Sequence, residues 1–331
     1  MAKIAFDAQS DLIPECRIVI NGLGRSGGAR WVSALQHVRA GSDDELARLL
    51  FQAPSVLVDQ IATEAGTQLV DVLSEGGIDV ELQPITAPFE PGCGEFDIAV
   101  FVEDPSALPL AVNELAHLLG VGAEHAVQLL SGQPPIVMGN VSSATVNALT
   151  ERVSEQPISV VSSRTVKAVY DVYMTPDTGA TVRHRVVGRL RGLGLNVDDP
   201  AVPTADEGMV VLGLDAEQAR EIWNAVGRRT SGVKIVDRAF QRYDILLEAL
   251  DPSAEAMATL VELTGMPASL APKVFANLPI VVAQNQTHGE MTSAMQALGA
   301  VGAVAVSELT TFRSSKQGSA SPKSALANER T

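Results

Sequence analysis

The sequence predicts an α+β fold built as a tandem array of four small units, each with the element order β-α-α-β-α-β. The first observation is a repeated segment: FDIAVFVEDPSA at 96–107 and YDILLEALDPSA at 243–254 share an aromatic-Asp-Ile opening and a closing Asp-Pro-Ser-Ala. The second is that the same series of helical and strand-like stretches follows both segments. The third is composition: 46% of the residues are hydrophobic and only 4% aromatic, so the chain can bury cores and these cores are aliphatic.

Each unit is expected to span about 70 residues, which is small for an independent core and favours docking between neighbours. Two short helices follow the first strand, and a proline then precedes a β-branched second strand, as in PPIVMGNV and PIVVAQNQ. Pro134 and Pro279 correspond in this alignment. A third helix and a last strand complete the unit. The predicted organisation is an N-terminal arm at 1–13, repeat units at 14–86, 95–165, 166–241 and 242–313, and a disordered tail at 314–331.

Capping signals support the predicted helices. Asp104-Pro105 and Asp251-Pro252 each indicate an N-cap followed by proline at the first helical position. Thr287 and Glu290 have the spacing of a capping box at the start of the third helix of the last unit. Gly76-Gly77 stands between a third helix and a last strand, where a left-handed C-cap is expected.

Charge and cysteine content exclude several functional classes. The net charge is −15 over 331 residues, so nucleic acid and anionic membrane surfaces are unfavourable partners. The two cysteines, Cys16 and Cys93, are too few for a disulfide framework or a zinc module. The N-terminus lacks the apolar core of a secretory signal, and the apolar stretch 291–307 is too short and polar to span a bilayer. We therefore expect a cytoplasmic protein without a membrane span.

The unit resembles the C-terminal domain of the bacterial ribosomal stalk protein, most clearly at 95–164. The residues that carry the resemblance are Glu95-Phe96-Asp97 in the first strand, the glycine turn Gly120-Val121-Gly122, Pro134, Val141-Ser142 and the last strand Ile158-Ser159-Val160. This resemblance implies the fold. It does not imply the ribosomal function, because that family binds factors through a Lys-rich helix face and no lysine occurs between Lys3 and Lys167. The family's dimerisation segment is also missing.

A glycine-rich loop follows the first predicted strand. Gly22-x-Gly24-x-x-Gly27 has the outline of a dinucleotide-binding turn and resembles the first turn of nicotinamide-dependent dehydrogenases. Such a fold needs a second parallel strand that ends in Asp or Glu, but SDDELARLLFQA in that zone predicts a helix. A plain connector is the favoured interpretation, and an anion-binding loop is the second.

Few other residues suggest a site. Arg183, Arg185, Arg189 and Arg191 form a basic helical stretch, which is either a candidate partner-binding surface or a solvated helix face. His117 and His125 fall in successive predicted helices, without a third ligand at metal-binding spacing. Cys93 has no neighbouring base, and the acidic cluster Asp43-Asp44-Glu45 suits a helix start better than a metal.

The sequence therefore predicts a non-catalytic, cytoplasmic protein–protein interaction scaffold or adaptor with no metal and no cofactor. Repeated apolar faces also allow self-assembly into a homo-oligomer. Two alternatives stay open. One is a nucleotide-binding oxidoreductase that uses Gly22, Gly24 and Gly27, and the other is a translation-associated factor.

Overall fold

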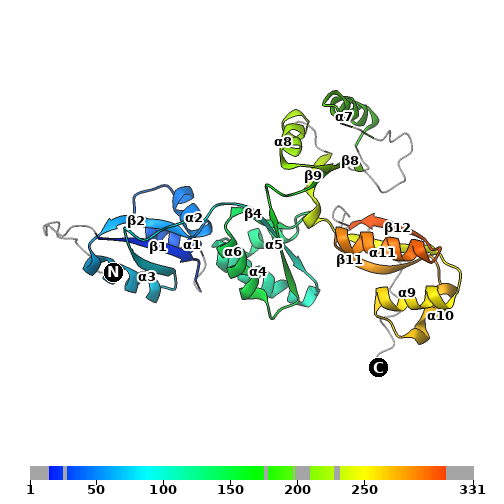
Figure 1. Ribbon diagram of the computed structural model, residues 1–331, viewed down its shortest axis with the longest axis horizontal. Helices are drawn as coiled ribbons and strands as arrows, with labels where there is room; N and C mark the ends of the chain where they lie inside the picture. Colours follow the sequence, from blue (N-terminus) through cyan, green and yellow to red (C-terminus); the bar gives the residue numbers. More distant parts are fainter. Residues whose placement is uncertain are drawn as a thin grey trace. The chain divides into compact units, whose positions relative to one another are not determined.

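The computed structural model describes residues 15–24, 28–174, 178–195, 197, 209–226 and 232–310 (Figure 1). The predicted arm at 1–13 and tail at 314–331 lie outside these residues. The chain divides into two compact units, which we call unit 1 (Met1–Arg164) and unit 2 (Thr165–Thr331).

Unit 1 contains two successive groups of three strands, which we call repeats 1 and 2. Repeat 1 comprises β1 (Cys16–Gly22), α1 (Ala29–Leu35), α2 (Asp43–Phe51), β2 (Ser55–Ile61), α3 (Thr63–Glu75) and β3 (Asp79–Pro84). Repeat 2 comprises β4 (Phe96–Val102), the 3-10 turn η1 (Pro105–Ala107), α4 (Leu108–Leu119), α5 (Ala123–Leu130), β5 (Ile136–Val141), α6 (Ser143–Val153) and β6 (Ile158–Arg164). Both repeats follow the predicted order β-α-α-β-α-β.

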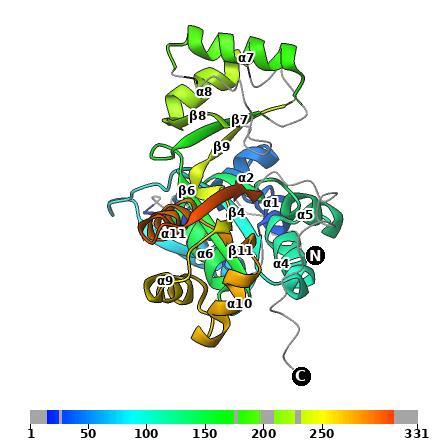
Figure 2. The same ribbon diagram turned by 90° about the vertical axis from the view of Figure 1, so that its right-hand side faces the viewer.

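Unit 2 contains repeats 3 and 4. Repeat 3 comprises β7 (Tyr170–Met174), α7 (Ala180–Gly192), β8 (Met209–Leu214), α8 (Ala216–Ala225) and β9 (Val233–Asp237), and the 3-10 turn η3 (Arg238–Phe240) follows it. Figure 2 shows α7 and α8 on one side of the strands of this repeat. Repeat 4 comprises β10 (Tyr243–Ala249), α9 (Ala254–Thr264), η4 (Ala268–Leu270), α10 (Ala271–Ala276), β11 (Ile280–Gln286), α11 (His288–Ala300) and β12 (Val304–Leu309).

Each repeat forms one three-stranded antiparallel sheet with its first strand in the centre. The strand orders are β2-β1-β3, β5-β4-β6, β8-β7-β9 and β11-β10-β12. The predicted α+β class and the presence of four small sheets are thus confirmed. Pro54, Pro134 and Pro279 all follow a cis peptide bond just before the second strand of their repeat, so Pro134 and Pro279 occupy corresponding places.

The second strand of each repeat carries a β-bulge opposite the second residue of the central strand. In three repeats the bulged residue has a positive φ and donates its backbone N–H to a central-strand aspartate. The pairs are Asn140 with Asp97 (3.1 Å), Gly213 with Asp171 (2.8 Å) and Asn285 with Asp244 (3.0 Å). In repeat 1, Arg17 of the central strand stands at the position of these aspartates. The aspartate of the aromatic-Asp-Ile signature therefore holds the bulge.

This role predicts a local effect for Asp97→Ala. The variant leaves the Asn140 N–H without its acceptor, so we expect a loss of about 1 kcal/mol of stability, confined to the bulge. Hydrogen exchange should become faster at β5 and stay unchanged at β6. Asp97→Asn, which keeps an acceptor oxygen, should lose less, and equal losses in the two variants would contradict the assignment.

Three capping predictions are confirmed and one is wrong. Asp104 caps η1, Thr287 and Glu290 form a capping box, and Gly77 has a positive φ of 92°. Asp251 is not an N-cap, because α9 begins at Ala254 and the Ser253 hydroxyl accepts from Ala256 N (3.0 Å). Ser253, directly before the first residue of α9, takes the capping role expected of Asp251.

The two units differ in how their cores are arranged. In unit 1 a single apolar cluster runs from Ile18 and Leu50 in repeat 1 to Leu118 and Leu149 in repeat 2. In unit 2 the apolar clusters of repeats 3 and 4 are separate. Repeats 1 and 2 therefore share one core, whereas repeats 3 and 4 each have their own.

Candidate functional site

The described part of the glycine-rich loop is shaped by packing within repeat 1. Gly22 ends β1, and Gly24 has φ +56°. A Cβ at Gly24 would lie 2.0 Å from the Gly77 carbonyl oxygen, so only glycine fits there. Gly27 lies outside the described residues. Because β1 pairs antiparallel with both β2 and β3, its setting differs from the parallel β-α-β unit of a dinucleotide-binding turn.

The end of this loop joins repeat 1 to repeat 2. Gly28 is the N-cap of α1, and its N–H donates to the Leu118 carbonyl near the end of α4 (2.7 Å). A Cβ at Gly28 would lie 2.6 Å from Cζ of Phe51 and 3.2 Å from that carbonyl oxygen. The partly positive N-terminal end of α1 therefore contacts the partly negative C-terminal end of α4. Gly28 permits this close approach because it has no side chain.

A second helix-end contact runs in the opposite direction. The Phe51 carbonyl at the end of α2 accepts hydrogen bonds from Ser142 N (2.9 Å) and Thr145 Oγ1 (2.8 Å) at the start of α6. Gln52 Nε2 donates to the Asn140 carbonyl oxygen (2.9 Å). Together with the shared core, these contacts join repeats 1 and 2 into one compact unit.

A groove of about 270 Å³ lies beside these contacts, between α2 and β5. Three segments form its walls. They are α2 with its C-cap (Ala47, Arg48, Phe51 and Gln52), the end of α4 (Leu119) and β5 (Met138, Gly139, Asn140 and Val141). The lining is mainly apolar. Arg48 is exposed at the rim, and β5 is an edge strand of its sheet. The predicted sites did not include this groove.

The four candidate arginines do not share one face. Arg185 and Arg189 are exposed one turn apart on α7, whereas Arg183 is half-buried. Arg191 is exposed but points about 120° away from Arg185, at 100° per helical residue. The structure thus places Arg185 and Arg189 together and separates Arg191 from them.

The other candidate side chains have local roles or stand apart. His117 and His125 are exposed on α4 and α5, and within the described residues no three His, Cys, Asp or Glu side chains are grouped to hold a metal ion. Glu45 completes a capping box with Ser42, whose hydrogen bonds lower the pKa of Glu45. Cys93 donates its Sγ–H to Glu95 (2.8 Å), and this bond raises the pKa of the thiol.

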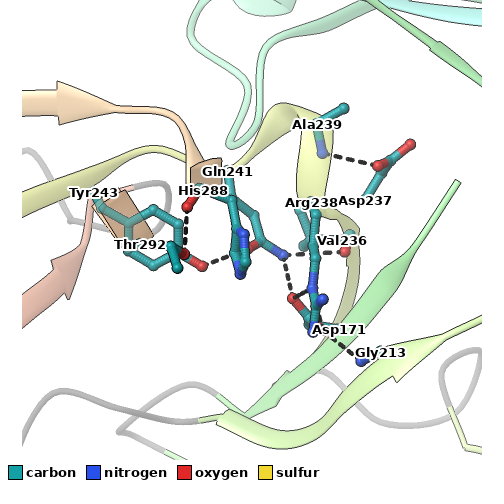
Figure 3. A network of polar contacts seen from close by, with 10 residues as sticks. All are labelled: Asp171, Gly213, Val236, Asp237, Arg238, Ala239, Gln241, Tyr243, His288 and Thr292. Carbon is teal, nitrogen blue, oxygen red and sulfur yellow. Dashed lines mark hydrogen bonds and ion pairs between the residues drawn. The ribbon is translucent and has the colours of Figure 1, made fainter. Parts of the chain in front are cut away.

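A buried polar network joins repeats 3 and 4 and brings together several titratable side chains among the described residues of unit 2 (Figure 3). Asp171 of β7 is fully buried and accepts three bonds of 2.9–3.1 Å from the Arg238 guanidinium. Gly213 N (2.8 Å) and Gln241 Nε2 (3.0 Å) complete its hydrogen bonding. Both carboxylate oxygens are thus satisfied by charge-assisted bonds.

The network continues into repeat 4 through aromatic side chains. Tyr243 of β10 donates its hydroxyl to Gln241 Oε1 (2.5 Å), and Figure 3 shows Gln241 between Asp171 and Tyr243. Burial raises the pKa of Tyr243 and of Tyr173 in β7. The His288 ring contacts Tyr243 edge-to-face with centroids 6.0 Å apart. Burial and the charge of Arg238 lower the pKa of His288. Sequence reasoning missed this network.

The lowered pKa of His288 predicts an acid-sensitive repeat 4. The unfolded chain binds the proton more tightly than the folded one, so the free energy of unfolding falls as the pH drops below about 6.5. His288→Gln removes this dependence. The stability of the wild type relative to the variant, measured by urea denaturation, should be lower at pH 5.5 than at pH 8. A constant difference would contradict the expectation.

Within the described residues no helix is long and apolar enough to cross a membrane. No protein-family model, curated protein or solved structure matches the chain.

Proposed function

We propose that the protein is a non-catalytic protein–protein interaction scaffold or adaptor, and that the groove between α2 and β5 binds an extended segment of a protein partner. The observation that carries the proposal is an apolar groove bordered by an edge strand, on a unit whose two repeats share one core. The two free cysteines suit a reducing compartment, and the proposal places the protein in the cytoplasm.

An edge strand next to a helix is a common setting for peptide binding. β5 pairs with β4 on one side, and among the described strands no other pairs with its outer edge. An extended peptide adds to such an edge through main-chain hydrogen bonds and places alternate side chains in the neighbouring groove. Phe51, Leu119 and Met138 supply the apolar walls, and Arg48 at the rim favours a partner segment with an acidic residue.

The expected relationship to the C-terminal domain of the ribosomal stalk protein also remains a proposal. The element order of repeats 1, 2 and 4 supports it, as does the left-handed Gly120 (φ 63°) between α4 and α5. The charge of the helix surface differs from the Lys-rich face of that family, because α5 carries Glu124 and His125 and no lysine. A shared fold with a different binding surface is therefore the form of the relationship that we propose.

A matched pair of substitutions tests the groove. Ala47→Tyr places a large side chain in the groove, and Ala123→Tyr makes the same change at an exposed position of α5. Proteins captured by the full chain from a lysate of the native host are compared by quantitative mass spectrometry. We expect at least one partner to be lost about tenfold or more with Ala47→Tyr and kept with Ala123→Tyr.

Charge reversal then separates the groove from the arginine helix. Arg48→Glu should weaken the same partner about fivefold, because the rim charge is reversed. Arg185→Glu on α7 is the matched control and should have no effect. Loss with Arg185→Glu alone would assign binding to α7, and a partner insensitive to both Ala47→Tyr and Arg48→Glu would refute the groove.

A further inference from the structure

The junction between repeats 1 and 2 and the junction between repeats 3 and 4 differ in the side chains that form them. Repeats 1 and 2 share an apolar core, which is fixed by backbone bonds between helix ends. Repeats 3 and 4 have separate cores, and the side chains between them are polar and aromatic. Division of the shared core would expose many apolar side chains. Opening of the second junction would expose mainly polar side chains together with the buried ring of Phe240, at a smaller cost in apolar surface.

Buried charge is concentrated at the second junction. Among the described residues, the buried charged side chains are Asp171, Asp237, Arg242 and Asp244, all in or next to the segment that leads from repeat 3 to repeat 4. Gln241 in the same segment is fully buried, and its amide bonds both Asp171 and the Val236 carbonyl oxygen (3.3 Å). Arg242 Nη1 donates to the carbonyl oxygens of Ala239 (3.2 Å) and Gln241 (2.7 Å), which fixes the backbone of this segment.

We propose that the Asp171–Arg238–Gln241–Tyr243 network is a conformational latch between repeats 3 and 4. Intact, it holds the two repeats in one arrangement. Broken, it lets repeat 4 move relative to repeat 3 while both cores stay folded.

The bond geometry explains why Asp171 controls the latch. Its carboxylate holds Arg238 in η3 and Gln241 in the connecting segment, and Gln241 in turn holds Tyr243 in the first strand of repeat 4. Removal of one partner from a buried ion pair leaves the other charge uncompensated. The remaining charged side chain is then more stable when it is exposed to solvent. Arg238 is already partly exposed at 28% of its side-chain surface, so it can turn outward without the unfolding of either core.

The latch is tested in the full chain by Asp171→Ala. Spin labels at the exposed positions Gln218 on α8 and Glu262 on α9 report the distance between the repeats, in a Cys93→Ser background. We expect a broader distance distribution and about tenfold faster hydrogen exchange over residues 238–242, with β7 and β10 still protected. An unchanged distribution would refute the latch. Loss of protection in β7 and β10 together would show that the network is simply part of the folding core.

Two further variants separate the latch from loss of the bulge bond. Asp97→Ala removes the corresponding aspartate of repeat 2, where the bulge bond is present without an arginine pair, and should leave the label distances unchanged. Tyr243→Phe removes the hydroxyl that donates to Gln241 and keeps the aromatic ring. It should broaden the distribution of label distances less than Asp171→Ala does. A distribution as narrow as that of the wild type would contradict the proposed connection through Gln241 and Tyr243.

Discussion

Gly24→Ala should destabilise unit 1 by about 2–4 kcal/mol, the combined effect of a left-handed backbone and an overpacked contact. The φ of +56° disfavours any Cβ, and the new methyl group would lie 2.0 Å from the carbonyl oxygen of Gly77. That oxygen belongs to the backbone, so it cannot turn away as a side chain could. The free energy of unfolding, measured by urea denaturation, should fall accordingly.

Gly22→Ala is the matched control for this prediction. Its nearest neighbour would be Asp79 Oδ2 at 3.9 Å, an ordinary contact, so we expect a change within about 0.5 kcal/mol. A dinucleotide-binding turn would instead make both glycines matter for cofactor binding. Calorimetric titration with a nicotinamide dinucleotide at millimolar concentration should give no heat of binding. Binding that both variants abolish would overturn the structural interpretation.

The repeat made the fold class predictable from the sequence. The aromatic-Asp-Ile signature marked the central strands, and the spacing of Pro134 and Pro279 marked the second strands. The role of the aspartate was not predictable, because it depends on a bulge that forms only when two strands pair. The misplaced N-cap at Asp251 has a local cause: two oxygen-bearing side chains compete within three residues, and Ser253 takes the role.

The contacts between repeats could not be predicted from single segments. The sequence shows the glycine-rich loop, but the Gly28 N–H donates to a backbone carbonyl in repeat 2. Every residue has a backbone carbonyl, so the sequence does not indicate which one is the acceptor. Arg238 and Gln241 fall at the predicted boundary between two repeat units, where periodicity gives no information. Their partner Asp171 was visible only as part of a first strand. Long-range pairing, rather than local propensity, decides these sites.

The shared core of unit 1 predicts that repeats 1 and 2 unfold together. Leu118 is almost fully buried in this core, and its carbonyl bonds Gly28 of the other repeat. Leu118→Ala should cost about 2–5 kcal/mol, because the cavity lies where the two repeats meet. We expect hydrogen exchange near the urea midpoint to become faster by the same factor in β1 and β4, although the substitution lies in repeat 2 alone.

Leu247→Ala provides the comparison in unit 2. Leu247 is equally buried, but its cluster contains residues of repeat 4 only. The same deletion of side-chain volume should therefore lower protection in β10 and leave β7 of repeat 3 unchanged. If Leu118→Ala affected β4 without β1, repeats 1 and 2 would be independent folding units. The helix-end contacts would then hold together two bodies that are each stable alone, and the groove between α2 and β5 would lose the shared core that supports its proposed binding role.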